Sequence, residues 1–457
     1  MTYAAILGII TKVRNNDTSH SSTTYLTPIV NLSDKISRRK ALGGLASLAT
    51  ISIVPSRVLG LNGQTAPSNE LTRAIIGCGG ISASHMPMPG RLLALCDVDS
   101  QRLDQRMKQA TKRGDKDVKG YHDFREIIAR DDIDIVHTCT PPHWHAYMAI
   151  AAAKSGKAVW GEKPMSRTIG EGMAMKKAIA EAGTAYRINT WFRFKSNFYG
   201  SGVTARQVKK AVDGGMIGKG PYKVTLSGAT GFNWKFNWSG KTNLPIQAVP
   251  KHFDYDFWLG PAPYRPYNSH RTHGTFRGYW DYDGGGLGDM GQHYLDPVQY
   301  ILGKDNELPV SVEIDADPQD TDAVGSWRRI TYKYADGTTI VLDGENKDKN
   351  AAFIEGPEGK IFKGFKSDVK GFAEKVKTLP EPEAQITDFH QAIREKKKFA
   401  LNEQNGFNSC TLINLGKIAH RVNANLNFDP KKMQFLDNDL ANSLIDQPFR
   451  EKWKLPV

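Results

Sequence analysis

A short apolar run that ends in a glycine-rich turn constrains the fold of this chain more than any other feature. Residues 73–82 read RAIIGCGGIS, so a strand-like segment runs into glycines with the spacing G-x-G-x-x-S. In a dinucleotide-binding turn the first glycine permits a tight bend, and the second lets the backbone approach a pyrophosphate. Ser82 stands where Gly or Ala is usual, so the match is imperfect. The residues that we expect to contact a dinucleotide here are Gly77, Gly79, Gly80 and Ile81.

An acidic residue lies where such a turn requires one. A second apolar run, residues 91–96, ends at Asp97, about 20 residues beyond the first glycine. A carboxylate at this position accepts hydrogen bonds from the ribose hydroxyls and repels a 2'-phosphate. No arginine follows Asp97 immediately. The sequence therefore favours NAD over NADP as the cofactor.

The residues that follow alternate between helical and strand patterns. Helices are predicted over 101–113, 123–130 and 146–155, and buried strands over 133–139 and 157–160. Strands and helices that alternate after a glycine turn are typical of a doubly wound parallel sheet. We therefore predict an α/β Rossmann domain over residues 69–190.

The first 68 residues read as a targeting signal and linker. Residues 37–42 are SRRKAL, and a weakly apolar run over 41–54 follows before Pro55 and a polar stretch. Such a run is too short to cross about 30 Å of hydrocarbon as a helix. A basic segment, a short apolar segment and a polar exit are typical of a signal peptide, and paired arginines indicate the twin-arginine route. We predict export to the periplasm by that machinery and no permanent membrane span. The alternative is an exposed basic patch before a small helix.

The net charge argues against a nucleic-acid-binding protein, and the cysteines argue against a zinc-binding or disulfide-stabilised one. Of the net charge of +13, residues 1–68 contribute seven Lys/Arg against two Asp/Glu, and the remainder is spread thinly. A positive charge spread so thinly gives little support for binding to a nucleic-acid phosphate backbone, so no nucleic-acid partner is predicted. The four cysteines match no zinc pattern or compact disulfide framework, and we expect buried, reduced thiols at Cys78, Cys96, Cys139 and Cys410.

Three motifs, taken in order, resemble a known family. Residues 140–145 (TPPHWH), 162–164 (EKP) and 284–296 (GGGLGDMGQHYLD) resemble those of the Gfo/Idh/MocA family of glucose–fructose oxidoreductase, inositol dehydrogenase and rhizopine catabolism. The resemblance extends over residues 71–457. Residues 258–263 (WLGPAP) and the tail 450–455 (REKWKL) resemble the exported, carbohydrate-linked branch of that family.

The second half of the chain has a different pattern. Strands are predicted over 223–227, 310–314, 330–334, 338–342 and 352–355, with a hairpin turn at Asp336-Gly337. Few helices separate them, which predicts an α+β domain over 191–457 with an open, mostly antiparallel sheet and C-terminal helices. The resemblance implies that this sheet covers the nicotinamide, and we expect it to mediate homo-oligomers. Residues 228–292 have no long periodic run and are rich in aromatic residues, which suits a large binding loop.

The chemistry of a sugar dehydrogenase assigns roles to three residues. His293 is the candidate base, because an unperturbed imidazole titrates near pH 6.5. Asp289 precedes it by four residues, so a helical turn would place both on one face, where Asp289 binds substrate or orients the imidazole. Lys163, held by Pro164 at a strand end, is the candidate cation that polarises the substrate oxygen. The role of Asp296 stays open between the site and support of the helix.

The remaining candidates divide between cofactor and substrate. We expect Thr140 and Pro141 to line the nicotinamide site. The other predicted cofactor contacts near it are His145, Glu162 and Lys163. His143 and His145 lack a clear third partner, so no metal site is predicted. Aromatic rings stack on the apolar faces of pyranoses, and the predicted substrate contacts are Arg193, His270, Arg271, His273 and Trp280. The alternative is that this aromatic loop packs on itself.

These predictions favour an exported oxidoreductase that acts on a carbohydrate or polyol with tightly bound NAD. One alternative is a glycosidase that oxidises a ring hydroxyl transiently, eliminates the aglycone, adds water and returns the hydride. Some hydrolases of the family depart from Glu-Lys-Pro, and the presence of Lys163 favours the dehydrogenase. A second alternative is a non-catalytic, nucleotide-holding carbohydrate sensor.

Overall fold

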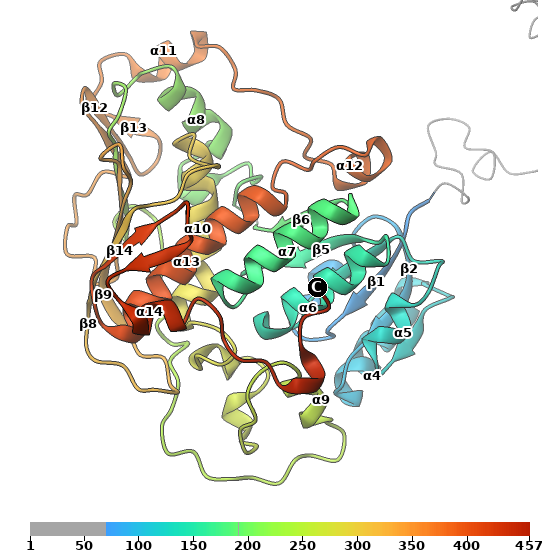
Figure 1. Ribbon diagram of the computed structural model, residues 1–457. Helices are drawn as coiled ribbons and strands as arrows, with labels where there is room; N and C mark the ends of the chain where they lie inside the picture. Colours follow the sequence, from blue (N-terminus) through green and yellow to red (C-terminus); the bar gives the residue numbers. More distant parts are fainter. Residues whose placement is uncertain (1–69, 191) are drawn as a thin grey trace, which may run out of the picture. The chain divides into compact units, whose positions relative to one another are not determined.

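The computed structural model describes residues 70–190 and 192–457 (Figure 1). The predicted twin-arginine signal lies outside the described residues. In the described part, no helix is long and apolar enough to cross a membrane. The four cysteines are buried and free, as predicted.

The first part of the described chain is a six-stranded parallel sheet, as the glycine turn and the alternating pattern predict. Its strands lie in the order β3-β2-β1-β4-β5-β6. Their bounds are β1 Thr72–Ile76, β2 Arg91–Cys96, β3 Lys119–Tyr121, β4 Ile135–Thr138, β5 Ala158–Glu162 and β6 Tyr186–Asn189. The strand order reverses between β1 and β4, and ligands of such sheets bind at the carboxyl ends beside this point.

Helices cover both faces of this sheet. They are α3 Ser82–His85, α4 Ser100–Arg113, α5 Phe124–Ile128, α6 His145–Lys154 and α7 Ile169–Ala182. Successive residues of β1 point to opposite faces: Ile75 packs in the cluster that contains Ala110 of α4, whereas Ala74 and Ile76 pack in the cluster of α5, α6 and α7. The Asp99 side chain caps α4 by accepting from two backbone amides, and Gly114 ends that helix in the left-handed conformation.

The second part contains a nine-stranded sheet in the order β13-β12-β11-β7-β10-β9-β8-β14-β15. The strands are β7 Lys223–Leu226, β8 Ser311–Ala316, β9 Trp327–Lys333, β10 Thr339–Asp343, β11 Ile354–Gly356, β12 Gly359–Phe362, β13 Lys366–Ser367, β14 Leu426–Asp429 and β15 Gln434–Leu436. The β7–β10 pair is parallel and the other pairs that involve these strands are antiparallel. The predicted mostly antiparallel sheet is confirmed, and the last four strands add to it.

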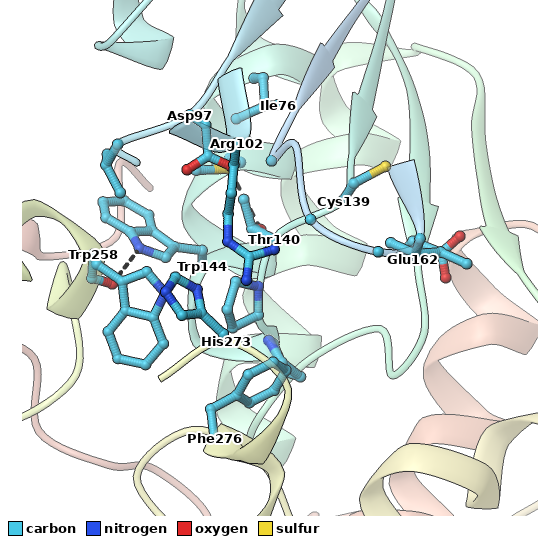
Figure 2. A pocket seen from close by; sticks show the side chains of 18 of the residues that line it. Ile76, Asp97, Arg102, Cys139, Thr140, Trp144, Glu162, Trp258, His273 and Phe276 are labelled. Atoms are coloured by element: carbon cyan, nitrogen blue, oxygen red, sulfur yellow. Dashed lines mark hydrogen bonds between the residues drawn. The ribbon is translucent and has the colours of Figure 1, made fainter. Parts of the chain in front are cut away.

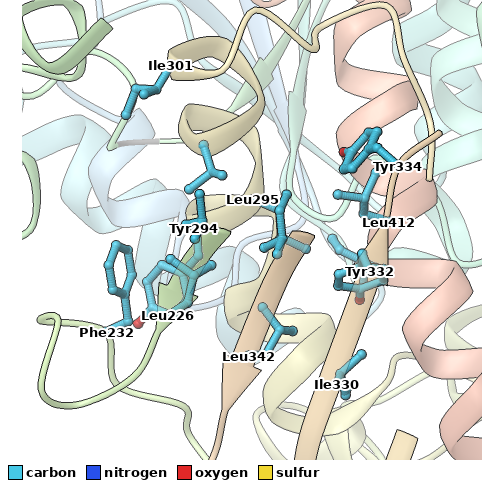
Figure 3. Packing of buried hydrophobic residues seen from close by; sticks show 14 of the residues in the cluster. Leu226, Phe232, Tyr294, Leu295, Ile301, Ile330, Tyr332, Tyr334, Leu342 and Leu412 are labelled. Carbon is cyan, nitrogen blue, oxygen red and sulfur yellow. The ribbon is translucent and has the colours of Figure 1, made fainter. Parts of the chain in front are cut away.

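Two long helices pack on this sheet. Helix α10 (Gly285–Ile301) and helix α13 (Glu403–Val422) share one apolar cluster with the strands, to which Leu295, Leu412, Tyr332 and Leu342 all belong (Figure 3). Every residue of α10 is buried, including its polar residues. Buried polar side chains need partners, so this helix is where ion pairs or a site must be sought.

The remaining elements are short. They are η2 Pro142–Trp144, η3 Phe198–Gly200, α8 Ala205–Asp213, α9 Tyr255–Leu259, η4 Ser269–Arg271, η5 Thr275–Gly278, α11 Phe372–Thr378, α12 Phe389–Glu395, α14 Asp439–Ser443 and η6 Glu451–Trp453. Most of residues 228–284 form loops and short turns, as predicted, but α10 already begins at residue 285. Its glycine-rich start hides the helical period, because glycine disfavours helix interiors.

Candidate active site

A cavity of about 280 Å³ lies at the carboxyl ends of the parallel strands (Figure 2). One wall comes from the ends of β1, β2, β4 and β5, and the opposite wall comes from residues 253–289 of the second part. The site therefore forms where the parallel sheet meets the second sheet domain, which is where the strand order predicts a ligand.

The glycine turn forms the floor of one end of this cavity. Gly77 has a φ of +93°, and a Cβ added to it would lie 2.6 Å from the carbonyl oxygen of Cys139, so no side chain fits. Gly77, Gly79, Gly80 and Ile81 all line the cavity. A Cβ at Gly79 or Gly80 would instead have room, so these two positions leave the backbone accessible from the cavity, which fits a dinucleotide pyrophosphate.

The serine at the third position of the turn has a structural explanation. Ser82 Oγ donates to the Gly79 carbonyl at 2.6 Å and accepts from Arg106 Nε at 2.7 Å. Arg106 Nη2 also donates to the Gly79 carbonyl, at 2.8 Å. The hydroxyl therefore fixes the turn to helix α4 instead of simply leaving space for helix packing.

Asp97 lines the same end of the cavity. Its carboxylate accepts from the Cys78 amide at 2.6 Å and from the Asp99 amide at 2.8 Å. Burial raises the pKa of Asp97 to about 6, although these backbone hydrogen bonds oppose the shift. Arg102, one turn into α4, also lines the cavity and was not predicted (Figure 2). Arg102 does not follow Asp97 directly in the sequence, so only the position of helix α4 shows that its positive charge lies at this end of the cavity.

We expect Asp97→Asn to weaken NADH binding. A hydrogen bond to a charged group contributes about 1.5–3 kcal/mol, which corresponds to a roughly 10- to 150-fold rise in Kd. Binding of NADPH should be less affected or improve, because the repelling charge is removed beside Arg102. Fluorescence titration with both nucleotides measures the ratio, and Asp104→Asn, on the exposed side of α4, is the control. Equal affinity of the parent protein for NADH and NADPH would contradict this role of Asp97.

The other end of the cavity contains a compact group of charges. Lys163 Nζ donates to Asp289 Oδ1 at 2.8 Å and to the Asp289 carbonyl at 2.6 Å. Arg277 Nε donates to the same Oδ1 at 2.7 Å. Burial favours the neutral acid, but the charges of Lys163 and Arg277 outweigh it and hold the pKa of Asp289 well below its usual range. Asp289 is therefore ionised, and it orients cations instead of transferring protons.

His293 follows Asp289 by one turn of α10, as predicted, and is 5% exposed. Burial and the nearby Lys163 charge lower the pKa of His293 well below its ordinary value, although Asp289 opposes the shift. Its ring packs edge-on against Phe192, with centroids 5.3 Å apart. His293 does not itself line the cavity. A neutral imidazole in this place has the protonation state that a general base requires.

The predicted cofactor residues at strand ends fall into two groups. Thr140, Pro141 and Glu162 line the cavity. The Glu162 carboxylate accepts from His85 Nε2 at 2.7 Å and from Asn189 Nδ2 at 2.5 Å. His145 does not line the cavity, so its direct cofactor contact stays a prediction. Its ring nitrogens face the carbonyls of Pro164 and Thr140 at 2.7 and 2.8 Å, so it supports two loops from behind.

Of the five predicted substrate residues, His273 lines the cavity. Arg193 does not: it is 4% exposed and pairs with Asp296 at 2.7 Å and Asp305 at 2.6 Å. This ion pair favours the helix-supporting role for Asp296, which also accepts a hydrogen bond from the Thr190 hydroxyl at 2.9 Å.

The other three also have partners outside the cavity. His270 Nδ1 lies 2.6 Å from the Tyr279 hydroxyl, and Arg271 pairs with Asp322 at 3.0 Å. The Trp280 indole is buried and donates to the Asp320 carbonyl at 3.1 Å. Only the His270 contact lies within the aromatic loop, because Asp320 and Asp322 come after it in the chain. The loop has its own aromatic cluster, yet some of the same side chains line the cavity, so both interpretations hold in part.

Several lining residues were not predicted individually, although most of them lie in the aromatic loop or in the motifs that the sequence singles out. Besides Arg102 and Arg277, the cavity wall includes an aromatic set, which consists of Phe124, Trp144, Phe253, Phe257, Trp258 and Phe276. Trp144 belongs to the TPPHWH motif, whose predicted cofactor contacts are Thr140, Pro141 and His145 and do not include Trp144. An acid just before α10, Asp283, also lines the cavity, and burial raises its pKa to about 6.

Among the described residues, no group of three or more His, Cys, Asp or Glu is arranged to hold a metal ion. His143 Nε2 donates to the Trp258 carbonyl at 3.0 Å, and both nitrogens of His145 face carbonyls. The two histidines after the prolines therefore connect loops.

Comparison with known proteins gives family matches over most of the chain. Residues 71–190 match the Gfo/Idh/MocA model described as "Oxidoreductase family, NAD-binding Rossmann fold", and residues 201–455 match "Oxidoreductase family, C-terminal alpha/beta domain".

Individual relatives are more distant. A glycosyl hydrolase family 109 protein of Saccharopolyspora erythraea is 31% identical over 143 residues, 28% of this chain and 31% of that protein. Levoglucosan dehydrogenase of Pseudarthrobacter phenanthrenivorans is 26% identical over 244 residues, 51% of this chain and 52% of the enzyme. The chain thus aligns with about a third to a half of these curated relatives. The WlbA dehydrogenase from Bordetella pertussis, solved with NADH and UDP-GlcNAcA, has the same fold, with a TM-score of 0.54 and 18% identity over 79% of this chain and 99% of that one.

Proposed function

The chain belongs to the Gfo/Idh/MocA oxidoreductase family, and on this premise we propose that it is an NAD-dependent oxidoreductase that acts on a CH–OH group of a carbohydrate or polyol. The observation that carries the proposal is the cluster of Lys163, Asp289 and His293. It lies beside the cavity whose floor at one end is the glycine turn. The levoglucosan dehydrogenase relative supports the substrate class.

One set of residues in the site would bind the cofactor, and another set would carry out the chemistry. The glycine turn and Asp97 would hold the pyrophosphate and ribose of NAD, while Thr140, Pro141 and Glu162 line the path towards Lys163. When bound, NAD supplies the hydride acceptor. Lys163 would turn from Asp289 to the substrate oxygen and stabilise the charge that develops there. The neutral His293 would take the hydroxyl proton.

Arg277 allows Lys163 to move without leaving a buried charge unpaired. Asp289 is buried, and an ionised carboxylate that loses its partner in such a place is costly. Because Arg277 shares the same carboxylate oxygen, Asp289 keeps one cation when Lys163 turns towards substrate. Arg277 is itself held between Trp238 and Phe276, 4.9 and 4.8 Å from the ring centroids. The site is therefore pre-organised for a lysine that alternates between two partners.

A second candidate is the NAD-dependent glycosidase, which the family 109 relative favours. Its first step would be the same: His293 would take the proton from the hydroxyl of the carbon that is being oxidised. The two candidates differ in the net reaction. Retention of Lys163 next to Pro164 supports the dehydrogenase as the first choice.

Export by the twin-arginine route, which we also propose, would place the enzyme where no substantial pool of free NAD is expected. An exchangeable cofactor would then allow a single turnover. We expect the cofactor to stay bound, with a second sugar taking the hydride back or with a redox-neutral net reaction. Acid release followed by mass spectrometry would identify the nucleotide that accompanies the purified protein.

A titration without free NAD separates the candidates. Reduction of bound nicotinamide, followed by absorbance while one sugar is added, should stall and then reverse when an oxidised second sugar is supplied. Release of an aglycone with no lasting absorbance change would identify the glycosidase. A protein that purifies empty and works only with freely exchanging NAD would contradict the bound-cofactor proposal.

A further inference from the structure

The wall of the cavity opposite the glycine turn includes a segment that crosses from the second sheet domain. We name residues 253–277 the roof segment, because Phe253, Phe257, Trp258, His273 and Phe276 of this range all line the cavity. Its start is joined to the Rossmann part by backbone hydrogen bonds, from the Asp254 amide to the Val98 carbonyl (3.0 Å) and from the Ser100 amide to the His252 carbonyl (2.9 Å).

The C-terminal tail contacts the roof segment from the outside. The tail runs from α14 to a position beside α9 (Figure 1). Arg450 Nε donates to the Gly260 carbonyl at 2.7 Å, and its Nη2 donates to the Asp256 carbonyl at 2.7 Å. The guanidinium also pairs with the Asp256 carboxylate, to which Lys452 Nζ adds an ion pair at 3.0 Å. The end of the chain is thereby attached to both ends of α9.

Trp453 packs on the back of the cavity wall. It is 2% exposed, and its ring stacks on Phe257 with centroids 5.2 Å apart and meets Trp144 edge-on at 4.9 Å. Phe257 and Trp144 both line the cavity, whereas Trp453 does not. The Trp144 indole in turn donates to the Trp258 carbonyl at 2.9 Å. Trp453 thus joins one Rossmann side chain and one roof side chain into a single aromatic wall.

From these contacts we infer that Arg450 and Trp453 are positioning residues that hold the roof segment closed over bound NAD and set the rate at which the cofactor leaves. The inference rests on the proposed function only in taking NAD as the ligand of the cavity. Neither side chain touches the cavity, so each acts through Phe257, Trp144 or α9. The tail is also held to the Rossmann part, where the Gly170 amide of α7 donates to the Ile445 carbonyl at 2.9 Å. Opening of the roof would therefore pull on the Arg450 hydrogen bonds and separate the rings around Trp453.

The test is the dissociation rate of NADH from the full chain. Protein loaded with NADH is mixed with excess NAD, and the loss of bound nicotinamide fluorescence is followed with time. Trp453→Ala and Arg450→Gln should each accelerate dissociation at least roughly tenfold, because interface changes act mainly on dissociation rates. Trp453→Phe should restore most of the slow rate, since a ring still fills the gap between Phe257 and Trp144. Lys454→Ala is the matched control, because this exposed lysine lies in the same tail and its ion pair within residues 70–190 and 192–457 is with the exposed Glu451.

Thermal unfolding of each variant separates loss of fold from loss of closure. If Trp453→Ala does not fold, Arg450→Gln decides, because it leaves the aromatic wall in place. Unchanged NADH dissociation in folded Trp453→Ala and Arg450→Gln would overturn this inference alone. A parent protein that binds no NADH would overturn the proposed function and this inference together.

Discussion

Replacement of His293 with alanine is expected to reduce turnover by about 10²- to 10⁴-fold while NADH still binds, because a general base typically contributes that much. The imidazole is buried beside Lys163 and Asp289 but does not line the cavity that we assign to the cofactor. The loss should therefore appear in kcat and kcat/KM, with the Kd for NADH little changed. Stopped-flow turnover and fluorescence titration on the same preparation measure the two effects.

The pH profile gives a second measure of His293. The base must be neutral, so kcat/KM should rise as pH increases through the pKa of His293 and then level off. Burial and Lys163 lower that pKa, so the rise should be complete below the ordinary histidine value of about 6.5. His270→Ala is the control, because that ring contacts Tyr279 away from the cavity. Normal turnover of His293→Ala on a verified substrate would make His293 a structural residue.

The second large effect is expected for Lys163→Met. This variant keeps the length and apolar stem of the side chain and removes the ammonium that polarises the substrate oxygen. Loss of one such electrostatic group typically costs about 10²- to 10³-fold in kcat. Because Lys163 also lines the cavity at the strand end, NADH binding should weaken as well, unlike in His293→Ala.

The fold should tolerate Lys163→Met, and the structure explains why. Asp289 keeps its 2.7 Å contact with Arg277 when Lys163 is gone, so no buried carboxylate is left unpaired. Equal thermal unfolding of the variant and the parent protein would confirm this, and Lys177→Met, on the exposed face of α7, controls for the loss of a positive charge. A folded Lys163→Met enzyme with parental kcat would exclude Lys163 from the chemistry.

The two predictions together test whether one site performs both halves of the reaction. His293 and Lys163 reach the site from different sheet domains, one from α10 and the other from the end of β5. Asp289 links them, since it lies one turn before His293 and accepts from Lys163 at 2.8 Å. If both variants lose kcat and only Lys163→Met loses NADH affinity, the proton and the cofactor are handled by separate side chains.

The sequence by itself determined features that depend on neighbouring residues. The glycine turn, the acid about 20 residues later and the alternation of strands predict the parallel sheet and its cofactor end, because φ preferences and hydrophobic periods are local properties. The four-residue spacing of Asp289 and His293 predicts that they share one face of a helix for the same reason, and α10 confirms it.

Only the tertiary structure decided which charged and aromatic side chains face the cavity. Arg193 and Arg277 are both arginines near motifs, yet Arg193 is neutralised by Asp296 and Asp305, more than 100 residues away in sequence, while Arg277 meets Asp289 at the cavity. The same contrast separates two tryptophans. Trp280 is buried and donates to the Asp320 carbonyl, whereas Trp144 lies in the cavity wall. A long side chain takes its role from whichever partner the packed fold brings within about 3 Å, and that partner has no fixed distance along the chain.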